Sequence, residues 1–561
     1  MFIATTKSPS TGRISVYLKE GYRDQNGKVK HRNLKFYGFL DELEAQDPTI
    51  LQTLRDEAKQ KTKKDVNFLT LGIDLRQTTQ TKTRKNYGYI FLESIYNKLN
   101  IPSFIKAYSE SKDFKYDLDS ILKLLVYSRA LNPESKKKTY EKKSNYFFEL
   151  KDFSLDDVYR SLDQLTVMKD DLMIHLNKEI TSQGLRDVSL VFYDVTNYYF
   201  ESVSFDGFKE RGVSKENKET GIVQMGLFID NNGIPITYEL FPGNTNDLST
   251  MRPILEKIKK DFNLGKITIV ADKGNNSKSN LALIDGYGDD YIISQRIRNR
   301  GNMYSDIVLD DEGYIYNKDK SFKYKLVEFE KEIDIDGKTK VLKEHLMCFW
   351  SKDEEDYQRS KRGLLDEKIE KYISEPALLN ASNSFGIKKY FKKIKIDKKT
   401  GEVIKGKDTY VFNKDKYERD IALDGYYTIV TNNLELNPLD IIGHYRKLSK
   451  IEESFKITKS DLEGRPIYVW TRPHIEGHFL TCYLALLIYR LLQIKLDNKY
   501  PVHQIKEALN QASIIPLEQD IFISIDKSEV THNLFKTYQT NELNDYVRLE
   551  TIRSTIKKII S

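Results

Sequence analysis

Two short apolar runs, each followed by an aspartate, limit how this chain can fold. Residues 188–193 and 267–271 are rich in β-branched and aromatic side chains, and Asp194 and Asp272 come directly after them. Runs of this length and composition are typical of strands buried on both faces of a sheet. An aspartate at a strand end fits a ligand site, although an Asx turn or a helix cap places one there equally well. The sequence therefore predicts an α/β protein with a candidate carboxylate site at one edge of its sheet.

A third acidic residue, Glu452, lies in a segment with helical periodicity and no glycine or proline. Residues spaced by three and four positions would share one face of a single helix here: Tyr445, Leu448, Glu452, Phe455 and Lys459. Such a stripe is ordinarily a core stripe, but this one can offer a carboxylate to a metal ion while Tyr445 and Lys459 reach phosphate. Glu453 would point away from this face, so we favour Glu452.

Acids of this kind suit phosphodiester chemistry. In-line attack needs both the attacking and the leaving oxygen stabilised, which two Mg²⁺ ions held by a few carboxylates provide. Hard Mg²⁺ prefers oxygen ligands, which matches Asp and Glu rather than His or Cys.

The N-terminal third combines strand patterns with a lysine-rich helical region. Asn26-Gly27 lies between the strand-like segments 14–22 and 29–37, which predicts a hairpin. A later helical pattern stops near Pro133 and is followed by lysines interleaved with aromatic residues, namely Lys136, Lys137, Lys138, Lys142 and Lys143. We interpret this region as a DNA-binding module, and a solvated helix end is the alternative.

Composition and periodicity suggest where the regions begin and end. We expect a β-rich N-terminal unit at 1–41, a helical DNA-binding region at 42–186, an α/β core at 187–290 and 431–495, a β-rich insertion at 291–430 and a helical C-terminal region at 496–561. Within the core, segments 221–230 and 234–241 flank Asn231-Asn232-Gly233, which predicts a further hairpin.

Charge, cysteine usage and hydropathy bound the cellular setting. Lys and Arg number 90 against 83 Asp and Glu, and the net charge of +7 is compatible with a polyanionic partner. Cys348 and Cys482 are isolated, which excludes a disulfide framework and a multi-cysteine zinc site. The apolar stretch 479–492 contains Arg490 and is shorter than a bilayer span, so it reads as a buried helix. We expect a cytoplasmic protein with no signal peptide and no membrane partner.

Four strings resemble a DDE transposase of a bacterial insertion sequence, of the group with a β-strand insertion between the second Asp and the Glu. They are Tyr193-Asp194-Val195-Thr196, Phe241-Pro242-Gly243-Asn244-Thr245, Ala271-Asp272-Lys273-Gly274, and the 445–459 segment followed by Arg465-Pro466-Ile467-Tyr468. The resemblance implies an RNase H-like mixed-sheet catalytic core. It also implies that Asp194, Asp272 and Glu452 form the metal-binding triad for two Mg²⁺ ions, with Mn²⁺ able to substitute.

The same resemblance suggests which residues touch DNA. The signature helix of the group has Tyr, then Arg three positions on, Glu four after that and Lys seven beyond. Tyr445, Glu452 and Lys459 match this register, whereas Leu448 stands at the Arg position, so Arg446 is the candidate for the phosphate contact. A tryptophan in the inserted domain of such relatives can stack on a flipped base. Trp350 is the candidate here, and a buried core position is the alternative.

The function that the resemblance implies is transposition. Such an enzyme binds the terminal inverted repeats of an insertion sequence in double-stranded DNA, cuts them and joins the ends to target DNA. It would act as a homodimer on DNA and associate with the bacterial nucleoid. Two alternatives remain: a metal-dependent nuclease without joining activity, and an inactive DNA-binding relic.

Overall fold

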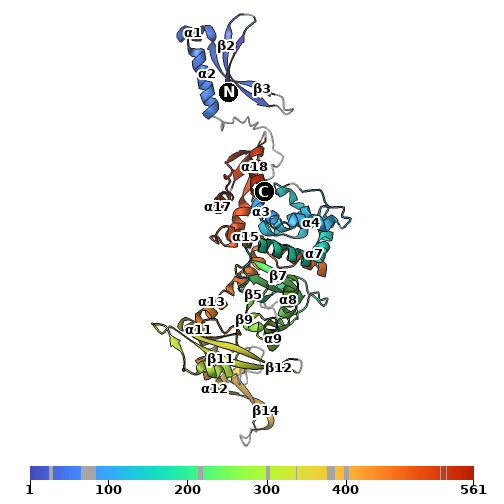
Figure 1. Ribbon diagram of the computed structural model, residues 1–561, viewed down its shortest axis with the longest axis vertical. Coiled ribbons are helices and arrows are strands. Elements are labelled where there is room, and N and C mark those ends of the chain that lie inside the picture. The colour runs from blue at the N-terminus through green and yellow to red at the C-terminus, as the bar shows by residue number, and fades with distance from the viewer. Residues whose placement is uncertain are drawn as a thin grey trace. The chain divides into compact units, whose positions relative to one another are not determined.

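The computed structural model describes most of the chain, which falls into two compact units, Met1–Thr81 and Lys82–Ser561 (Figure 1). The described residues are 1–9, 11–23, 29–64, 84–110, 112–148, 150–212, 219–298, 303–335, 338–375, 386–396, 403–517, 520–525 and 527–561.

The first unit is an antiparallel sheet with two helices. Strands β1 (Phe2–Lys7), β2 (Ile14–Arg23) and β3 (Val29–Phe39) pair in that order, followed by α1 (Leu40–Gln46) and α2 (Ile50–Lys64). α2 packs on β1, and Val16 of β2 and Leu54 of α2 are buried. The predicted Asn26-Gly27 turn lies outside the described residues. The expected boundary at residue 41 falls inside α1, because both helices are part of this unit.

The second unit is built on a nine-stranded mixed sheet with the order β10-β11-β12-β15-β9-β8-β5-β6-β7. β5, β8 and β9 run parallel to one another, and the other neighbours pair antiparallel. The predicted α/β class with a large mixed sheet is therefore confirmed. The strands are β5 (Val191–Tyr199), β6 (Ile222–Asp230), β7 (Pro235–Pro242), β8 (Thr268–Ala271), β9 (Asp290–Ser294), β10 (Ile315–Tyr316), β11 (Phe322–Ile335), β12 (Lys338–Ser351) and β15 (Tyr426–Thr431).

β5 is longer than the sequence suggested. The strand does not end at Asp194, because the ladder with β6 continues to Tyr199 and most side chains in this half are buried. β8 does end directly before Asp272. The predicted β6–β7 hairpin is confirmed. Gly233 adopts a φ of +81° in its turn, and the Asp230 carboxylate accepts hydrogen bonds from the backbone N–H groups of Asn232 and Ile234 at 3.0 and 2.9 Å.

Helices cover both faces of the central strands. On one face, α8 (Asp247–Asp261) and α9 (Lys278–Gly286) bury apolar residues in the same core as Tyr193. On the other face, α7 (Leu155–Ser182) and α15 (Arg472–Lys495) share a core with Phe192 and Tyr198. The Ser154 side chain caps α7 in a reciprocal capping box with Asp157.

α15 lies at the centre of the helical layer. It has the length and hydropathy to cross a membrane, but its whole apolar window is buried inside the protein, as predicted for a core helix. It packs against α3 (Tyr89–Lys98) and α5 (Leu118–Leu131), while α4 (Ile101–Glu110) and the short α6 (Lys136–Glu141) pack on α5 and α7. α5 ends two residues before Pro133, in agreement with the predicted stop.

The segment between β9 and β15 extends the large sheet and adds helices. β10, β11 and β12 join the sheet through β15, so the expected β-rich insertion is continuous with the core strands. It also contains α10 (Met303–Leu309), the long α11 (Lys352–Ser374), α12 (Lys414–Ala422) and a separate ribbon of β13 (Phe391–Ile396) and β14 (Val403–Phe412).

The C-terminal region is not purely helical, which corrects our expectation for 496–561. It contains α16 (Val502–Gln511), α17 (Glu529–Thr537) and α18 (Leu549–Ile560), but also β16 (Ser513–Pro516), β17 (Ile521–Ile525) and β18 (Tyr546–Arg548). With β4 (Lys85–Asn86) they form a four-stranded sheet in the order β18-β17-β16-β4. The strands are short, and β16 pairs with a segment from the other end of the unit, so local periodicity could not reveal them.

Candidate active site

Asp194 and Asp272 lie at adjacent positions of two parallel strands. The register of β5 and β8 pairs the residue before Asp194 with the residue before Asp272. Asp272 keeps an extended backbone, with φ −78° and ψ 166°. Because side chains alternate along a strand, both aspartates share the face of Phe192 and Val270, which contribute to the core around α15. The two aspartates therefore lie on one face of the sheet, on adjacent strands near the end of β8.

The Asp272 carboxylate is held by two hydroxyl groups. Ser294, the last residue of β9, donates a hydrogen bond to Oδ1 at 3.0 Å, and the Tyr445 hydroxyl donates to the same oxygen at 3.4 Å. Burial, together with the nearby Asp272 charge, raises the pKa of Tyr445, so its phenol stays protonated and able to donate. The Asp194 carboxylate accepts from the backbone N–H of Val195 at 2.8 Å. Both aspartates are half-buried.

The predicted helix from Tyr445 to Lys459 is broken, which corrects the single-face argument. α13 (Pro438–Arg446) ends after Tyr445, a turn follows, and α14 (Ser449–Lys456) carries Glu452. A π-helical turn, η5 (Ile457–Asp461), then carries Lys459. The break occurs although the segment has no glycine or proline. α13 packs near the ends of β8 and β9, whereas α14 packs on β5 and β6.

α14 holds two adjacent glutamates in different surroundings. The Glu453 carboxylate pairs with the buried Arg490 guanidinium at 3.1 Å. Glu452 is exposed, and among the described residues its side chain makes no hydrogen bond or ion pair. α14 lies over the same sheet face as the two aspartates, because Ile451 and Phe455 belong to the core around α15. Of the two glutamates, Glu452 is thus the one whose side chain has no partner among the described residues, and its role as a metal ligand stays a prediction.

Lys459 reaches β5 two residues beyond Asp194. Its ammonium donates a hydrogen bond to the Thr196 hydroxyl and lies 5.7 Å from the centre of the Tyr198 ring. The Tyr198 hydroxyl is 2.6 Å from the hydroxyl of Thr458, the neighbour of Lys459. These contacts fix the cation beside the face that carries Asp194 and Thr196.

The other predicted contact residues lie around this centre. Arg446 ends α13 and is exposed, with no ion pair to any described residue, whereas Leu448 packs against the core. Trp350 is half-buried at the end of β12. A Cβ on Gly425 would lie 2.6 Å from its Nε1, so the indole packs directly against that backbone. The second tryptophan, Trp470, is 52% exposed.

The donor set fits a hard divalent cation, although the acids are not gathered into one cluster. Asp194, Asp272 and Glu452 offer only oxygen ligands on one face of the sheet. Among the described residues, no group of three His, Cys, Asp or Glu side chains is close enough to hold one ion. The two aspartates follow paired residues of neighbouring strands, and Glu452 lies on α14.

Sequence reasoning missed two partners of the predicted site, Ser294 and Thr196. Ser294 ends β9, whose apolar residues 291–293 resemble the runs before Asp194 and Asp272. A polar residue at the end of this third apolar run was the sequence signal that could have identified Ser294. Thr196 lies in the part of β5 that we had not predicted as strand.

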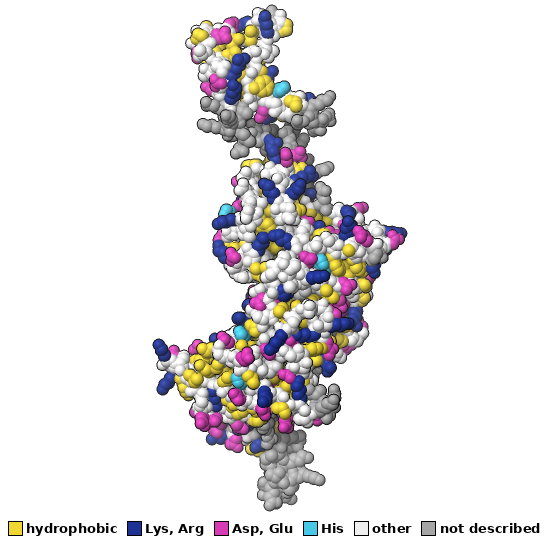
Figure 2. Space-filling model, viewed as in Figure 1, with side chains coloured by type: hydrophobic (Ala, Val, Ile, Leu, Met, Phe, Trp, Pro, Cys, Tyr) yellow, Lys and Arg dark blue, Asp and Glu magenta, His cyan; other side chains and the backbone are white. Residues whose placement is uncertain are grey.

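The lysine-rich region divides between surface and interior. Lys137, Lys138 and Lys142 are exposed on or beside α6, but Lys136 is only 5% exposed. On the face shown in Figure 2, Lys and Arg side chains are interspersed with Asp and Glu. Figure 2 therefore gives no single basic face, in keeping with the small net charge of +7.

Two family models match the sequence. The model of the transposase DDE domain matches residues 189–488, which is more than half of the 561-residue chain and includes Asp194, Asp272 and Glu452. The model of the N-terminal domain of IS1634 family transposases matches residues 3–67, the stretch that forms β1 to β3, α1 and α2. Curated proteins give no significant match.

Solved structures similar to the chain include three transposase complexes. The piggyBac transposase synaptic complex with hairpin DNA aligns over 84% of this chain and 83% of its own, at 9% identity and a TM-score of 0.36. The Mos1 mariner paired-end complex with Mn aligns over 32% and 59%, at 11% identity and a TM-score of 0.14. The Mos1 paired-end complex with the left transposon end aligns over 43% and 66%, at 10% identity and a TM-score of 0.15. Family membership rests on the two sequence matches.

Proposed function

Because the chain belongs to the DDE transposase family, we propose that it cuts the ends of an insertion sequence and joins them to target DNA at Asp194, Asp272 and Glu452. The observation that carries the assignment of these residues is the register of β5 and β8, which puts the two aspartates side by side on one face of the sheet. α14 brings Glu452 over the same face.

The catalytic core of this proposal is RNase H-like. The part of the large sheet that supports it is the order β7-β6-β5-β8-β9, in which β5, β8 and β9 are parallel while β6 and β7 form an antiparallel hairpin. The long interval between Asp272 and Glu452 holds the strands and helices that follow β9, in agreement with an insertion at this point.

We propose that Asp194, Asp272 and Glu452 hold two Mg²⁺ ions, for which Mn²⁺ can substitute. When bound, such ions stabilise charge on the attacking and leaving oxygens of a phosphodiester. The protein's own groups prepare the site for this charge. Ser294 and Tyr445 orient the Asp272 carboxylate by donating to one of its oxygens, which leaves the other oxygen available to a ligand.

Cationic side chains around the acids would bind the scissile phosphate. Lys459 is held beside Asp194 by Thr196 and Tyr198, so it can contact a phosphate oxygen without a large movement. Arg446 is exposed at the end of α13, next to the Tyr445 that touches Asp272, and it would take the phosphate contact that Leu448 cannot make. Trp350 remains our proposed base-stacking residue, and it would have to leave its packing against Gly425 to do so.

DNA recognition is assigned to the N-terminal unit and to the exposed lysines beside α6. The match of residues 3–67 to the N-terminal domain of IS1634 family transposases supports this division of labour. Since two ends must meet for transposition, we propose a homodimer on DNA. Sedimentation of the protein with paired-end DNA tests it, and monomers alone would contradict the dimer.

The decisive experiment incubates the full chain with labelled DNA bearing the flanks of its own gene and a supercoiled plasmid, with Mg²⁺ or Mn²⁺. The variant is Asp272→Asn, and the matched control is Asp152→Asn at a fully exposed aspartate. We expect metal-dependent cleavage and strand transfer with wild type and Asp152→Asn, and neither with Asp272→Asn. Cleavage that survives Asp272→Asn would place the active site elsewhere.

The same assay separates the two alternative functions. Cleavage without strand-transfer products would identify a nuclease that does not join DNA. Binding to the flanks without cleavage by any variant would identify a DNA-binding relic.

A further inference from the structure

A small cavity lies beside α6, outside the carboxylate site. It has a volume of about 50 Å³, and its lining includes Arg129 of α5, Lys136 of α6, His478 of α15 and Arg465 and Tyr468 of the segment that follows η5. A volume of this size exceeds the roughly 10–15 Å³ that one water needs, but it cannot admit a nucleobase.

Two buried cations reach this cavity without an acidic partner. Lys136 is 5% exposed, and within the described part of the chain its ammonium makes no ion pair or hydrogen bond. Arg129 is 7% exposed and donates to the carbonyl oxygens of Leu462, Glu463 and Glu134, each at 3.1 Å. Its Nε has no hydrogen-bond partner among the residues that the structure describes. Carbonyl oxygens satisfy some donors, but they do not neutralise the charge.

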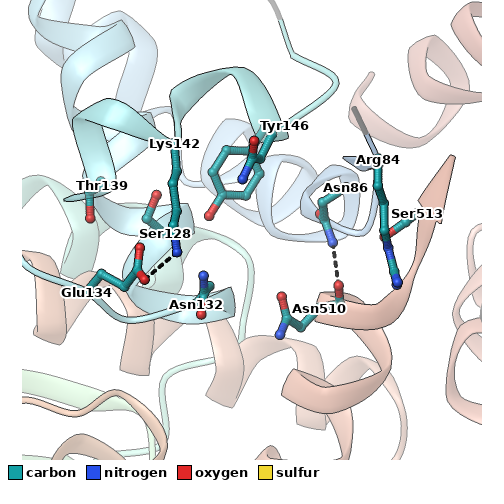
Figure 3. Close-up of a pocket in the computed structure, with 11 residues that line it drawn as sticks. Arg84, Asn86, Ser128, Asn132, Glu134, Thr139, Lys142, Tyr146, Asn510 and Ser513 are labelled. Carbon is teal, nitrogen blue, oxygen red and sulfur yellow. Dashed lines mark hydrogen bonds and ion pairs between the residues drawn. The ribbon is translucent and has the colours of Figure 1, made fainter. Parts of the chain in front are cut away.

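Of the glutamates that line the cavity, Glu134 is already ion-paired and Glu463 is exposed. The Glu134 carboxylate pairs with Lys142 at 2.5 Å, on the side where a larger polar pocket adjoins (Figure 3). Glu463 is exposed to solvent.

The remaining titratable neighbours carry no negative charge. Burial, with the charges of Arg129 and Lys136, lowers the pKa of His478 well below its usual value, so this imidazole is neutral and its Nε2 lies 3.2 Å from the Gly464 carbonyl oxygen. Burial likewise raises the pKa of the Cys482 thiol, which keeps it protonated.

We propose that this cavity binds one phosphate group, either of a DNA backbone or of free inorganic phosphate. Buried cations without counter-charge are costly, and an oxyanion that fits the cavity would neutralise them. Phosphate suits the donor set, because its oxygens can accept from the Lys136 ammonium, from the Arg129 Nε and from Arg465 together.

The location connects the site to the proposed function. The residues on one side belong to the lysine-rich α6, and those on the other follow η5, which carries Lys459. The DNA source rests on the proposed transposase activity, whereas binding of free phosphate does not.

The first test measures thermal unfolding of the full chain in chloride and in inorganic phosphate at matched ionic strength. The variant is Lys136→Met, and the matched control is Lys106→Met, at an exposed lysine of α4. We expect phosphate at about ten times its Kd to raise the unfolding temperature of wild type and Lys106→Met by about 1–3 °C, and that of Lys136→Met not at all. An equal rise in Lys136→Met would overturn the proposal. If Lys136→Met does not fold, Arg465→Gln takes its place.

The second test identifies the source of the phosphate. DNA affinity of the same proteins is measured between low and high salt with the flanking-DNA probe. If a backbone phosphate enters the cavity, the slope of log Kd against log salt falls by about 0.9 in Lys136→Met. If the slope of Lys136→Met equals that of wild type, while phosphate still stabilises wild type in the first test, the site binds free phosphate. Because the first test contains no DNA, a protein that fails to cleave DNA can still pass it, so the two proposals fail separately.

Discussion

The carboxylate edge of the large sheet and the cationic cavity beside α6 both gather like charges, but in opposite surroundings. Asp194 and Asp272 are half-buried, Glu452 is exposed, and hydroxyl groups support Asp272. Lys136 and Arg129 are buried, and neither forms an ion pair with an acid in the described residues. Exposed like charges are tolerated because water solvates them, whereas buried ones reduce stability until a ligand neutralises them. Ligand binding at the acidic site is therefore expected to change the free energy of unfolding little. Ligand binding in the cationic cavity is expected to increase it.

The largest expected effect is on the acidic side of this comparison, at α14. Glu452→Gln should lower cleavage by more than about 100-fold, beyond the loss expected for an outer-shell partner. It should leave the unfolding temperature unchanged, because the Glu452 side chain has no partner within the described part of the chain. Glu453→Gln should keep cleavage within a few-fold but lower the free energy of unfolding by about 1–2 kcal/mol, because it leaves the buried Arg490 without its acid. Cleavage and calorimetry on both variants check this contrast. If Glu453→Gln were inactive and Glu452→Gln active, Glu453 and not Glu452 would be the catalytic acid.

The next effect is on the cationic side and depends on pH. Burial, with the nearby Arg129 charge, lowers the pKa of Lys136 to about 7, from 10.5 in the unfolded chain. Between these values only the unfolded state holds the proton, so wild-type stability in chloride should rise as pH increases from 7 to 10.5. Below pH 7 the folded protein carries the full free-energy cost of burying the Lys136 charge. Lys136→Met should therefore be more stable than wild type there by about 1–4 kcal/mol. Denaturant unfolding of both proteins at pH 7 and pH 10 measures the difference. Equal pH dependence in the two would show that Lys136 does not titrate near 7.

A smaller effect tests how far hydroxyl support matters at the acidic edge. Ser294→Ala removes the 3.0 Å hydrogen bond to Asp272 and should lower cleavage or metal affinity by about 10-fold to 100-fold. Ser279→Ala, at an exposed serine of α9, is the control and should have no effect. Metal titration of the cleavage rate separates loss of affinity from loss of rate. Full activity in Ser294→Ala would mean that Tyr445 alone is sufficient.

The smallest effect concerns the exposed end of α13. Arg446→Gln should weaken DNA binding only a few-fold and reduce the slope of log Kd against log salt by about 0.9, as expected for the loss of one phosphate contact. Arg252→Gln is the control, since Arg252 is exposed on α8, over the opposite face of the sheet. An unchanged salt slope in Arg446→Gln would remove this residue from the DNA path.

The strands at the site were predictable from the sequence, but the contacts between elements distant in sequence were not. Apolar β-branched runs located β5 and β8, and the two aspartates follow from that local pattern. The break between Tyr445 and Glu452 has no local signal, because it arises where α13 packs near β8 and β9 while α14 packs on β5 and β6. Ser294 and Lys136 illustrate the same limit. A hydrogen bond across strands and a lysine buried at the start of a helix depend on partners distant in sequence.

The pairing of β4 with β16 governs when the protein can complete its fold during synthesis. The Asn86 side chain donates to the Leu509 carbonyl oxygen, 423 residues further along the chain, at 2.7 Å. A ribosome adds about 5–20 residues per second, so β4 emerges roughly 20–85 s before its partner strand exists. A prematurely terminated chain can therefore contain Asp194, Asp272 and Glu452 and still lack the strand pairing that joins the start of the second unit to its end.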